Sequence, residues 1–109
     1  MQSMEYTATI NGANISSWDS FHDEFQKEFG FFEGYGRNLN AWIDCMSDLS
    51  TNGEYDSLTK FNLNNGDRLI LKIINTEGWK KKSPETFDAF IDCCISANEN
   101  ETNFLLDIR

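Results

Sequence analysis

The segment Arg68–Asn75, with the sequence RLILKIIN, limits the possible folds of this chain more than any other feature. Five of its eight residues are leucine or isoleucine. A short run so rich in branched apolar residues is typical of a buried central strand. Buried strands of this kind belong to parallel sheets, whose strands are joined through helices. The segment therefore predicts an α/β fold, provided that helices and further strands flank it.

Two further strands and three helices are expected around this segment. The strands are Glu5–Ile10, closed by an Asn-Gly turn, and Phe104–Ile108. The helices begin at a serine cap (Ser16 or Ser17), at Asn38, and at Ser83-Pro84-Glu85. The order is β-α-α-β-α-β, which favours a three-stranded parallel sheet packed by helices. We expect residues 1–109 to form one domain.

Apolar residues at helical spacing define the core faces of the first two helices. On the first helix, which Gly30 ends, the stripe is Trp18, Phe21, Phe25 and Phe29. On the second helix it is Leu39, Trp42, Ile43, Met46 and Leu49. We expect His22 on the surface of the first helix and the stretch TEGWKKK (76–82) in a loop. The polar stretch from Ser50 to Asp67 is expected to be irregular.

The negative charge is concentrated in the first half of the chain. The net charge is −9. Residues 1–57 contain ten acids and two bases, giving −8, whereas residues 58–109 contain eight acids and seven bases, giving −1. Such a chain repels nucleic acid and anionic membranes, and it attracts basic proteins. We therefore expect neither a nucleic acid nor a membrane as a direct partner.

The cysteines and the single histidine argue against disulfides and metal sites. The odd number of cysteines, with Cys93 and Cys94 adjacent, does not form a disulfide framework, and free thiols including Cys45 fit a reducing cytosol. His22 is the one histidine, and no zinc or calcium spacing accompanies it. No signal peptide or membrane-spanning run is visible. We expect a cytoplasmic protein without cofactor or metal.

The second helix carries the candidate site. Asn40, Asp44 and Asp48 are spaced i, i+4 and i+8, so that they project in one row, with Ser47 on the same face. Glu33 lies in the preceding loop, and Tyr35 and Trp42 could border the surface, which has no base between Asn38 and Glu54. Pattern alone leaves two interpretations: a solvated polar face, or an acidic recognition surface for a cationic site with Asp44 at its centre.

Two other functions deserve comparison with these interpretations. The tripeptide Asp56-Ser57-Leu58 resembles the attachment site of acyl carrier proteins, but those are all-helical, and branched strands follow here. Asp44 and Asp48 could in principle act as an acid–base pair. They lie on a convex helix without an evident pocket, so we do not expect an enzyme.

Several segments together resemble the barstar family of ribonuclease inhibitors. The match begins at ATINGANIS, continues through the helix SWDSFHDEFQKEFGF and peaks at YGRNLNAWIDCM. The family pattern Tyr-Gly-x-Asn-x-Asp-Ala-x-x-Asp-Cys corresponds to residues 35–45. The resemblance implies a three-stranded parallel sheet packed by helices and no enzymatic activity.

The resemblance also implies a partner and a binding surface. In the family, the loop before the second helix and the helix itself plug the active site of a basic secreted ribonuclease, and the aspartate matching Asp44 replaces a substrate phosphate. We expect a 1:1 complex with such a ribonuclease or with a nuclease toxin, and a monomer when free. The expected partner-binding residues are Glu33, Tyr35, Gly36, Arg37, Asn38, Asn40, Ile43, Asp44, Ser47 and Asp48. The alternative is an acidic interaction module, or an immunity protein of the same fold against a different toxin.

Some positions depart from the family pattern. Asn40 stands where the family has an aspartate, Gly34 where it often has a tyrosine, and Ile43 where a tryptophan is found. On the last helix, the acidic position aligns near Cys93, with Asp92 beside it. These departures leave the expected fold unchanged, but they indicate that the target can differ from the family's best-known ribonuclease.

Overall fold

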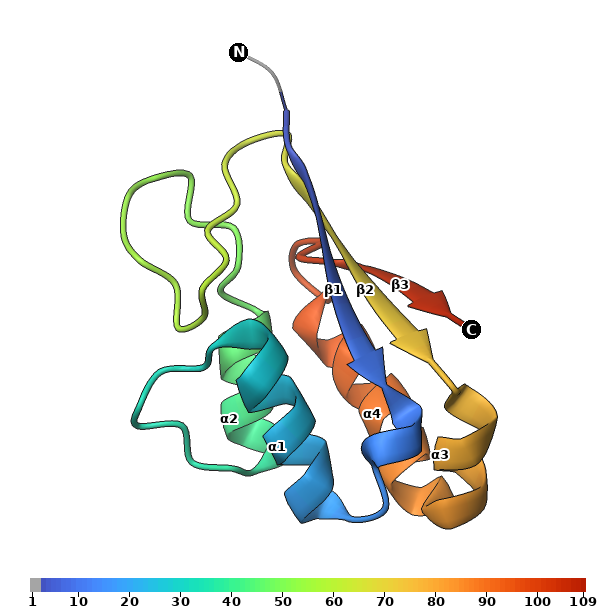
Figure 1. Cartoon of the computed structure of the whole chain (residues 1–109). Coiled ribbons are helices and arrows are strands. Elements are labelled where there is room, and N and C mark those ends of the chain that lie inside the picture. The colour runs from blue at the N-terminus through green and yellow to red at the C-terminus, as the bar shows by residue number, and fades with distance from the viewer. Residues whose placement is uncertain (1–2) are drawn as a thin grey trace.

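Strand β2 (Arg68–Ile74) lies at the centre of a three-stranded parallel sheet, which confirms the fold predicted from the sequence (Figure 1). The computed structural model describes residues 3–109. Strands β1 (Glu5–Asn11) and β3 (Leu105–Ile108) flank β2 on either side, both parallel to it. Leu71 is the register partner of Ala8 on β1 and of Leu106 on β3. The sheet order is therefore β1-β2-β3.

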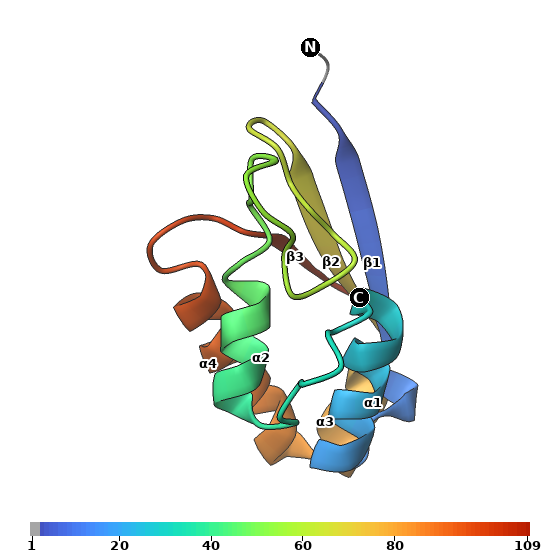
Figure 2. The ribbon, with the colours of Figure 1, turned by 90° about the vertical axis from the view of Figure 1, so that its left-hand side faces the viewer.

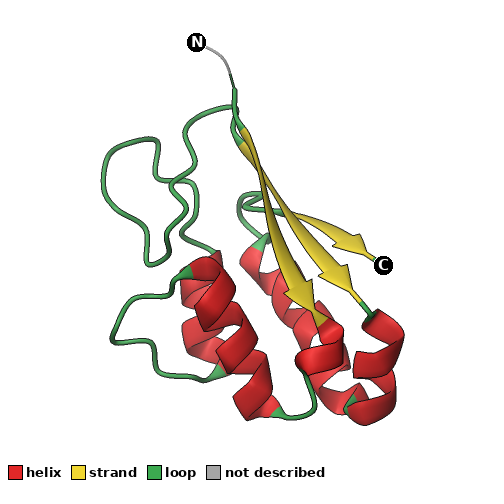
Figure 3. Ribbon diagram, viewed as in Figure 1, coloured by secondary structure: helices red, strands yellow, loops and turns green. Residues whose placement is uncertain are grey.

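Helices cover the sheet face that carries the buried side chains of β2, namely Leu69, Leu71 and Ile73 (Figure 3). The helices are α1 (Trp18–Phe29), α2 (Leu39–Met46), α3 (Thr76–Lys82) and α4 (Pro84–Ala97), and a short 3-10 helix, η1, spans Gly12–Asn14. Residues of the opposite face, such as Thr7 and Thr9, are exposed. Strands β1 and β2 thus alternate between a core face and a more exposed side.

Helix α1 begins and ends where its sequence predicts. The Ser17 hydroxyl accepts a hydrogen bond from the Ser20 amide, and Gly30 ends the helix in the left-handed region at φ 60°. Phe21, Phe25 and Phe29 are completely buried. Trp18 is the exception among the four residues expected in the core. It is 37% exposed, because it lies at the first position of the helix.

Trp42 fixes α2 between its two neighbouring helices. Its ring lies 5.4 Å from that of Phe25 on α1 and 5.9 Å from that of Phe90 on α4, measured between centroids. The side chain is fully buried. Figure 2 shows α2 from the side of the α1–α2 loop. Trp42 therefore lies inside the core, and the expectation that it could border the polar surface is wrong.

Two further sequence expectations are wrong. The segment 76–82 forms helix α3 instead of a loop, because Trp79 is fully buried and its indole NH donates to Thr86 Oγ1 at 2.8 Å. This tertiary contact outweighs the glycine in a seven-residue helix. His22 is buried, at 4% exposure, instead of lying on the surface.

The stretch between α2 and β2 is irregular, as predicted, and it is anchored at Leu63. This residue is buried, and its backbone bridges to Ser50. Ser57 is held within the loop, where its hydroxyl donates to the Phe61 carbonyl at 2.6 Å, and no helix starts there. The acyl-carrier interpretation fails, because the fold contains a parallel sheet and Ser57 does not open a helix.

Candidate functional site

Asn38 starts helix α2 in a defined direction. Its side-chain oxygen accepts a hydrogen bond from the Ala41 amide at 2.8 Å, while its own backbone is extended at φ −140°. Gly36 lies against this cap, because a Cβ added to it would lie 3.1 Å from Asn38 Nδ2. The turn and the cap therefore act together, as the sequence motif predicts.

The two faces of α2 differ completely in burial. Trp42, Cys45 and Met46 are fully buried, whereas Asn40 and Asp44 are exposed. Asp44 thus projects a carboxylate away from the core, from a helix whose opposite face is fixed by packing. The site can offer this negative charge to a partner without moving the backbone.

The cysteine beside Asp44 does not supply chemistry. Burial, and then the charges of Asp44 and Asp48, raise the pKa of the Cys45 thiol to about 11. A thiol that stays protonated is a poor nucleophile. The three cysteines are free thiols. Within residues 3–109, no group of three or more histidine, cysteine or acidic residues could hold a metal ion.

The acidic row is the expected set of Asn40, Asp44 and Asp48 with Ser47 beside them. The expectation that all of it lies on the second helix is wrong, because α2 ends at Met46, and Ser47 and Asp48 follow the helix and are engaged with the protein. Ser47 follows the last residue of α2, and its hydroxyl donates to the Ile43 carbonyl at 2.6 Å. Asp48 is half-buried and accepts a hydrogen bond from the Tyr55 hydroxyl at 2.8 Å. This hydrogen bond is the largest cause of the raised pKa of the Tyr55 phenol. Asn40 and Asp44 are therefore the more available members of the row.

Tyr55 is a surface residue that the sequence reasoning missed. It is 52% exposed and lies between Glu54 and Asp56, both of which are also exposed. The signal available in the sequence was an aromatic residue between two acids in a polar, irregular stretch. Tyrosine is enriched at protein interfaces. Through its bond to Asp48, Tyr55 attaches the loop between α2 and β2 to the acidic row.

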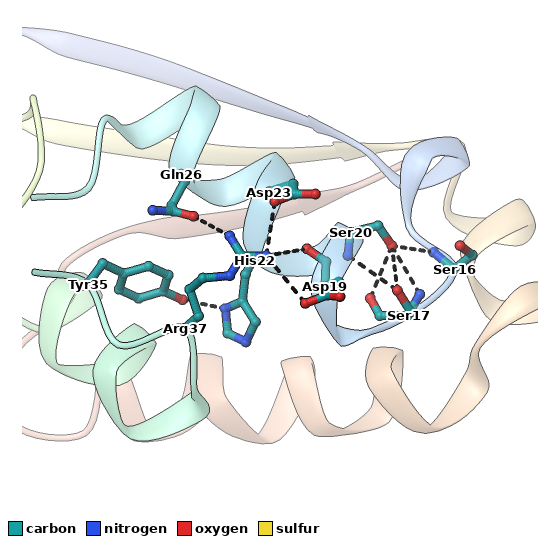
Figure 4. Close-up of polar contacts among 9 residues, drawn as sticks. All are labelled: Ser16, Ser17, Asp19, Ser20, His22, Asp23, Gln26, Tyr35 and Arg37. Carbon is teal, nitrogen blue, oxygen red and sulfur yellow. Dashed lines mark hydrogen bonds and ion pairs between the residues drawn. The ribbon is translucent and has the colours of Figure 1, made fainter. Parts of the chain in front are cut away.

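Tyr35 lies inside the protein, although it was expected on the binding surface. It is 6% exposed, and its hydroxyl is 2.5 Å from Nδ1 of His22 on α1 (Figure 4). Burial is the largest cause that lowers the pKa of His22; the nearby charge of Arg37 lowers it further, while Asp19 and Asp23 raise it. A neutral imidazole is thus favoured in the core, and Tyr35 can affect a partner only by holding its loop in place.

The side chain of Arg37, which is also expected to face a partner, is turned toward α1. Its guanidinium contacts Asp19, Asp23 and Gln26 on that helix (Figure 4). Beside it is a hollow of about 350 Å³ at the start of α2, lined by Trp18, His22, Arg37, Asn38 and Leu39. The hollow lies between α1 and α2, where a partner side chain would find both polar and apolar walls.

The structure brings most of the predicted site residues to one region. Glu33 and Gly36 are exposed in the loop before α2, Asn40 and Asp44 are exposed on the helix, and Ile43 is half-buried. The region holds carboxylates, an amide and a cap, but no pairing of a nucleophile with a base. These groups can form hydrogen bonds and ion pairs with a cationic group.

Comparison with known proteins agrees with this geometry. A family model described as Barstar (barnase inhibitor) matches residues 5–109, which is essentially the whole chain. No curated protein matches the sequence. Within residues 3–109, no helix is both long and apolar enough to cross a membrane. The match extends from β1 through β3 and includes the loop and helix of the acidic row, so the chain belongs to the barstar family of barnase inhibitors.

Proposed function

We propose that this protein is an intracellular inhibitor of a basic ribonuclease, and that it inserts the α1–α2 loop and α2 into the active site of the enzyme. The placement of Asp44 carries the proposal. Asp44 is exposed. Trp42, two residues before it on the helix, and Cys45, directly after it, are fully buried. Arginine, lysine and histidine side chains that bind a phosphate can also bind a carboxylate. Asp44 therefore takes the position of an RNA phosphate.

The rigidity of α2 supports this role. Binding that requires a loop or helix to become ordered loses part of its favourable free energy. Here the Asn38 cap fixes the start of α2, and Trp42 fixes its buried face between α1 and α4. The carboxylate of Asp44 is thus already oriented before the partner arrives.

The charge distribution supports a basic partner. The first 57 residues carry −8 of the total −9, and they include Asp44, Asp48 and Glu33. This field accelerates encounter with a cationic protein and repels nucleic acids and anionic lipids. The protein would bind its target in the cytoplasm, as a monomer, with 1:1 stoichiometry and without a cofactor or metal.

The rest of the proposed interface surrounds Asp44. Its members are Glu33, Gly36, Asn38, Asn40, Ile43, Ser47 and Asp48, while Tyr35 acts from the core. Asn40 gives a hydrogen bond where the family pattern has a charge, and Ile43 gives an aliphatic contact. These two differences favour a nuclease toxin other than barnase as the natural target, with this protein as its immunity factor.

An inhibition titration tests the proposal directly. The probes are barnase and any small basic secreted nuclease encoded beside this gene, each assayed for cleavage of RNA. We expect the activity of at least one of these enzymes to fall to zero at one equivalent of the protein. Raising NaCl from about 0.05 M to about 0.5 M should slow association by at least about tenfold, because screening removes the steering.

Two results would contradict the proposal. One is that both enzymes keep full activity in a large excess of the protein. The other is association that is independent of salt. If a basic protein without nuclease activity bound the acidic row instead, the alternative would hold, which is an acidic interaction module of the same fold.

A further inference from the structure

Arg37 is an unusual residue at its position. It is the one base between Lys27 and Lys60, and it lies in the loop that leads into the acidic α2. Its Nη2 lies 3.0 Å from Asp23 Oδ1 and 3.5 Å from Asp19 Oδ1, and it donates to the Asp19 carbonyl at 3.1 Å. Its Nη1 donates to Gln26 Oε1. Within residues 3–109, every recorded polar side-chain contact of Arg37 runs to one face of α1 (Figure 4).

The backbone of Arg37 is also unusual. Its φ is 53°, in the left-handed region that residues with a Cβ adopt at a cost in free energy. Strained conformations of this kind persist where surrounding contacts hold them. The next residue is Asn38, the cap of α2. The conformation of Arg37 therefore sets the direction in which α2 leaves the loop.

A second tie holds the same loop from inside. Two residues before Arg37, the buried Tyr35 hydroxyl contacts His22, which belongs to the same helix as Asp19 and Asp23. The loop is thus joined to α1 by a neutral contact in the core and by a charged contact at the surface. The charged contact is screened by salt and can be removed without opening the core.

We propose that Arg37 is a positioning residue, which latches the α1–α2 loop to α1 and so holds α2 in the orientation that presents Asp44. Arg37 then acts through Asp19 and Asp23 of its own chain, and not as a contact to the partner. The part of this inference that concerns Asp44 rests on the proposed inhibitory function. The part that concerns the loop can be tested without any partner.

Lys27→Gln provides a matched control for Arg37→Gln. Both substitutions remove one positive charge. Lys27 pairs with Glu24 at 3.7 Å within α1, and its side chain is 74% exposed, so it does not reach the loop. Amide hydrogen exchange is measured at Ala41 and Trp42, whose NH groups donate to Asn38. At low salt we expect about five-fold faster exchange in Arg37→Gln and unchanged exchange in Lys27→Gln.

Added salt and a glycine substitution distinguish the effect of the Arg37 ion pairs from the effect of its strained backbone. In the unmodified protein, about 0.5 M NaCl should speed exchange at Ala41 and Trp42 toward the rate of Arg37→Gln, and it should have no such effect in that variant. Arg37→Gly removes the side chain and also relieves the positive φ. The latch predicts faster exchange in Arg37→Gly. Slower exchange in this variant, or equal rates in Arg37→Gln and Lys27→Gln, would overturn the latch.

Binding kinetics test the orientation of Asp44. The probe is whichever ribonuclease the unmodified protein inhibits. Both glutamine variants are more negative by one charge, so both should associate at least as fast as the unmodified protein. Only Arg37→Gln should dissociate several-fold faster. Equal dissociation rates would overturn the positioning role, whereas a lack of inhibition by the unmodified protein would contradict the proposed function and leave the exchange result standing.

Discussion

Helices α2 and α4 pack against each other through Trp42 and Phe90, yet the residues that precede the two helices differ in how their charges are paired. Helix α2 exposes one aspartate, Asp44, and α4 exposes Asp88 and Asp92, while neither helix contains a base. Three lysines at the end of α3 directly precede α4, whereas the base that precedes α2 is paired with α1. The comparison teaches that the charge around a helix depends on the residues that flank it, and not on the composition of the helix alone.

The largest expected effect concerns the two faces of α2. Trp42→Ala should lower the free energy of unfolding by about 3–5 kcal/mol, because it opens a cavity between α1 and α4. Asp44→Ala, at an exposed position two residues further along the helix, should change it by less than about 0.5 kcal/mol. Urea denaturation measures both values. A large loss of stability in Asp44→Ala would show that this carboxylate supports the fold.

The residues that precede α2 and α4 should contribute unequally to stability, with the larger contribution at α2. Asn38→Ala removes the bond to the Ala41 amide and should cost about 1 kcal/mol of stability. Ser83 precedes α4, but its side chain makes no capping hydrogen bond. Ser83→Ala should therefore cost clearly less than Asn38→Ala in the same denaturation experiment. Equal costs would remove the special role of the α2 cap.

The burial of His22 should make stability depend on pH. The pKa of His22 is lowered in the folded protein, mainly by burial, so the unfolded chain binds more protons below about pH 6.5. The stability that His22 contributes is present above this pH and is lost as the pH falls through the lowered pKa. His22→Gln should flatten the fall in stability between about pH 7 and pH 5. An equally steep fall in the variant would contradict this assignment.

The smallest expected effect concerns the bond between Tyr55 and Asp48. Its removal by Asp48→Asn should return the pKa of Tyr55 toward its ordinary value, because the carboxylate acceptor is the first cause of the rise. Ultraviolet titration of the phenols, compared with the unmodified protein, measures the change. Asp92→Asn on α4 serves as a control and should leave the titration unchanged. A shift in the control, or none in Asp48→Asn, would show that the two residues do not interact.

The sequence predicted the elements whose signals are local. The central strand, the caps at Ser17 and Asn38 and the exposure of Asn40 and Asp44 follow from residue type and spacing. The predicted row fails at Asp48, which lies beyond the end of α2 and is half-buried. Helix α3 was missed because its stability comes from the burial of Trp79, a tertiary contact. The lack of bases within α2 was a weak signal, since α4 also contains none.

The contacts that organise the site could not be predicted in the same way. His22 falls beside the apolar stripe of α1, but its partner Tyr35 is 13 residues away in an irregular loop. Arg37 was expected at the interface because it lies within the motif, and only the fold shows its ion pairs with α1. Loop conformation depends on many long-range contacts, and spacing in the sequence does not encode them.

The comparison of α2 with α4 is tested most directly by removing one exposed aspartate from each. Asp44→Ala and Asp92→Ala delete the same charge from exposed helix positions, and the affinity of each variant for the inhibited ribonuclease is measured at equal salt. Asp44→Ala should weaken the complex by about 2–5 kcal/mol or more, because it leaves the cationic groups of the enzyme buried without a partner. Asp92→Ala should change it by less than about 0.5 kcal/mol. Equal losses would place the interface away from α2 and contradict the role of Asp44.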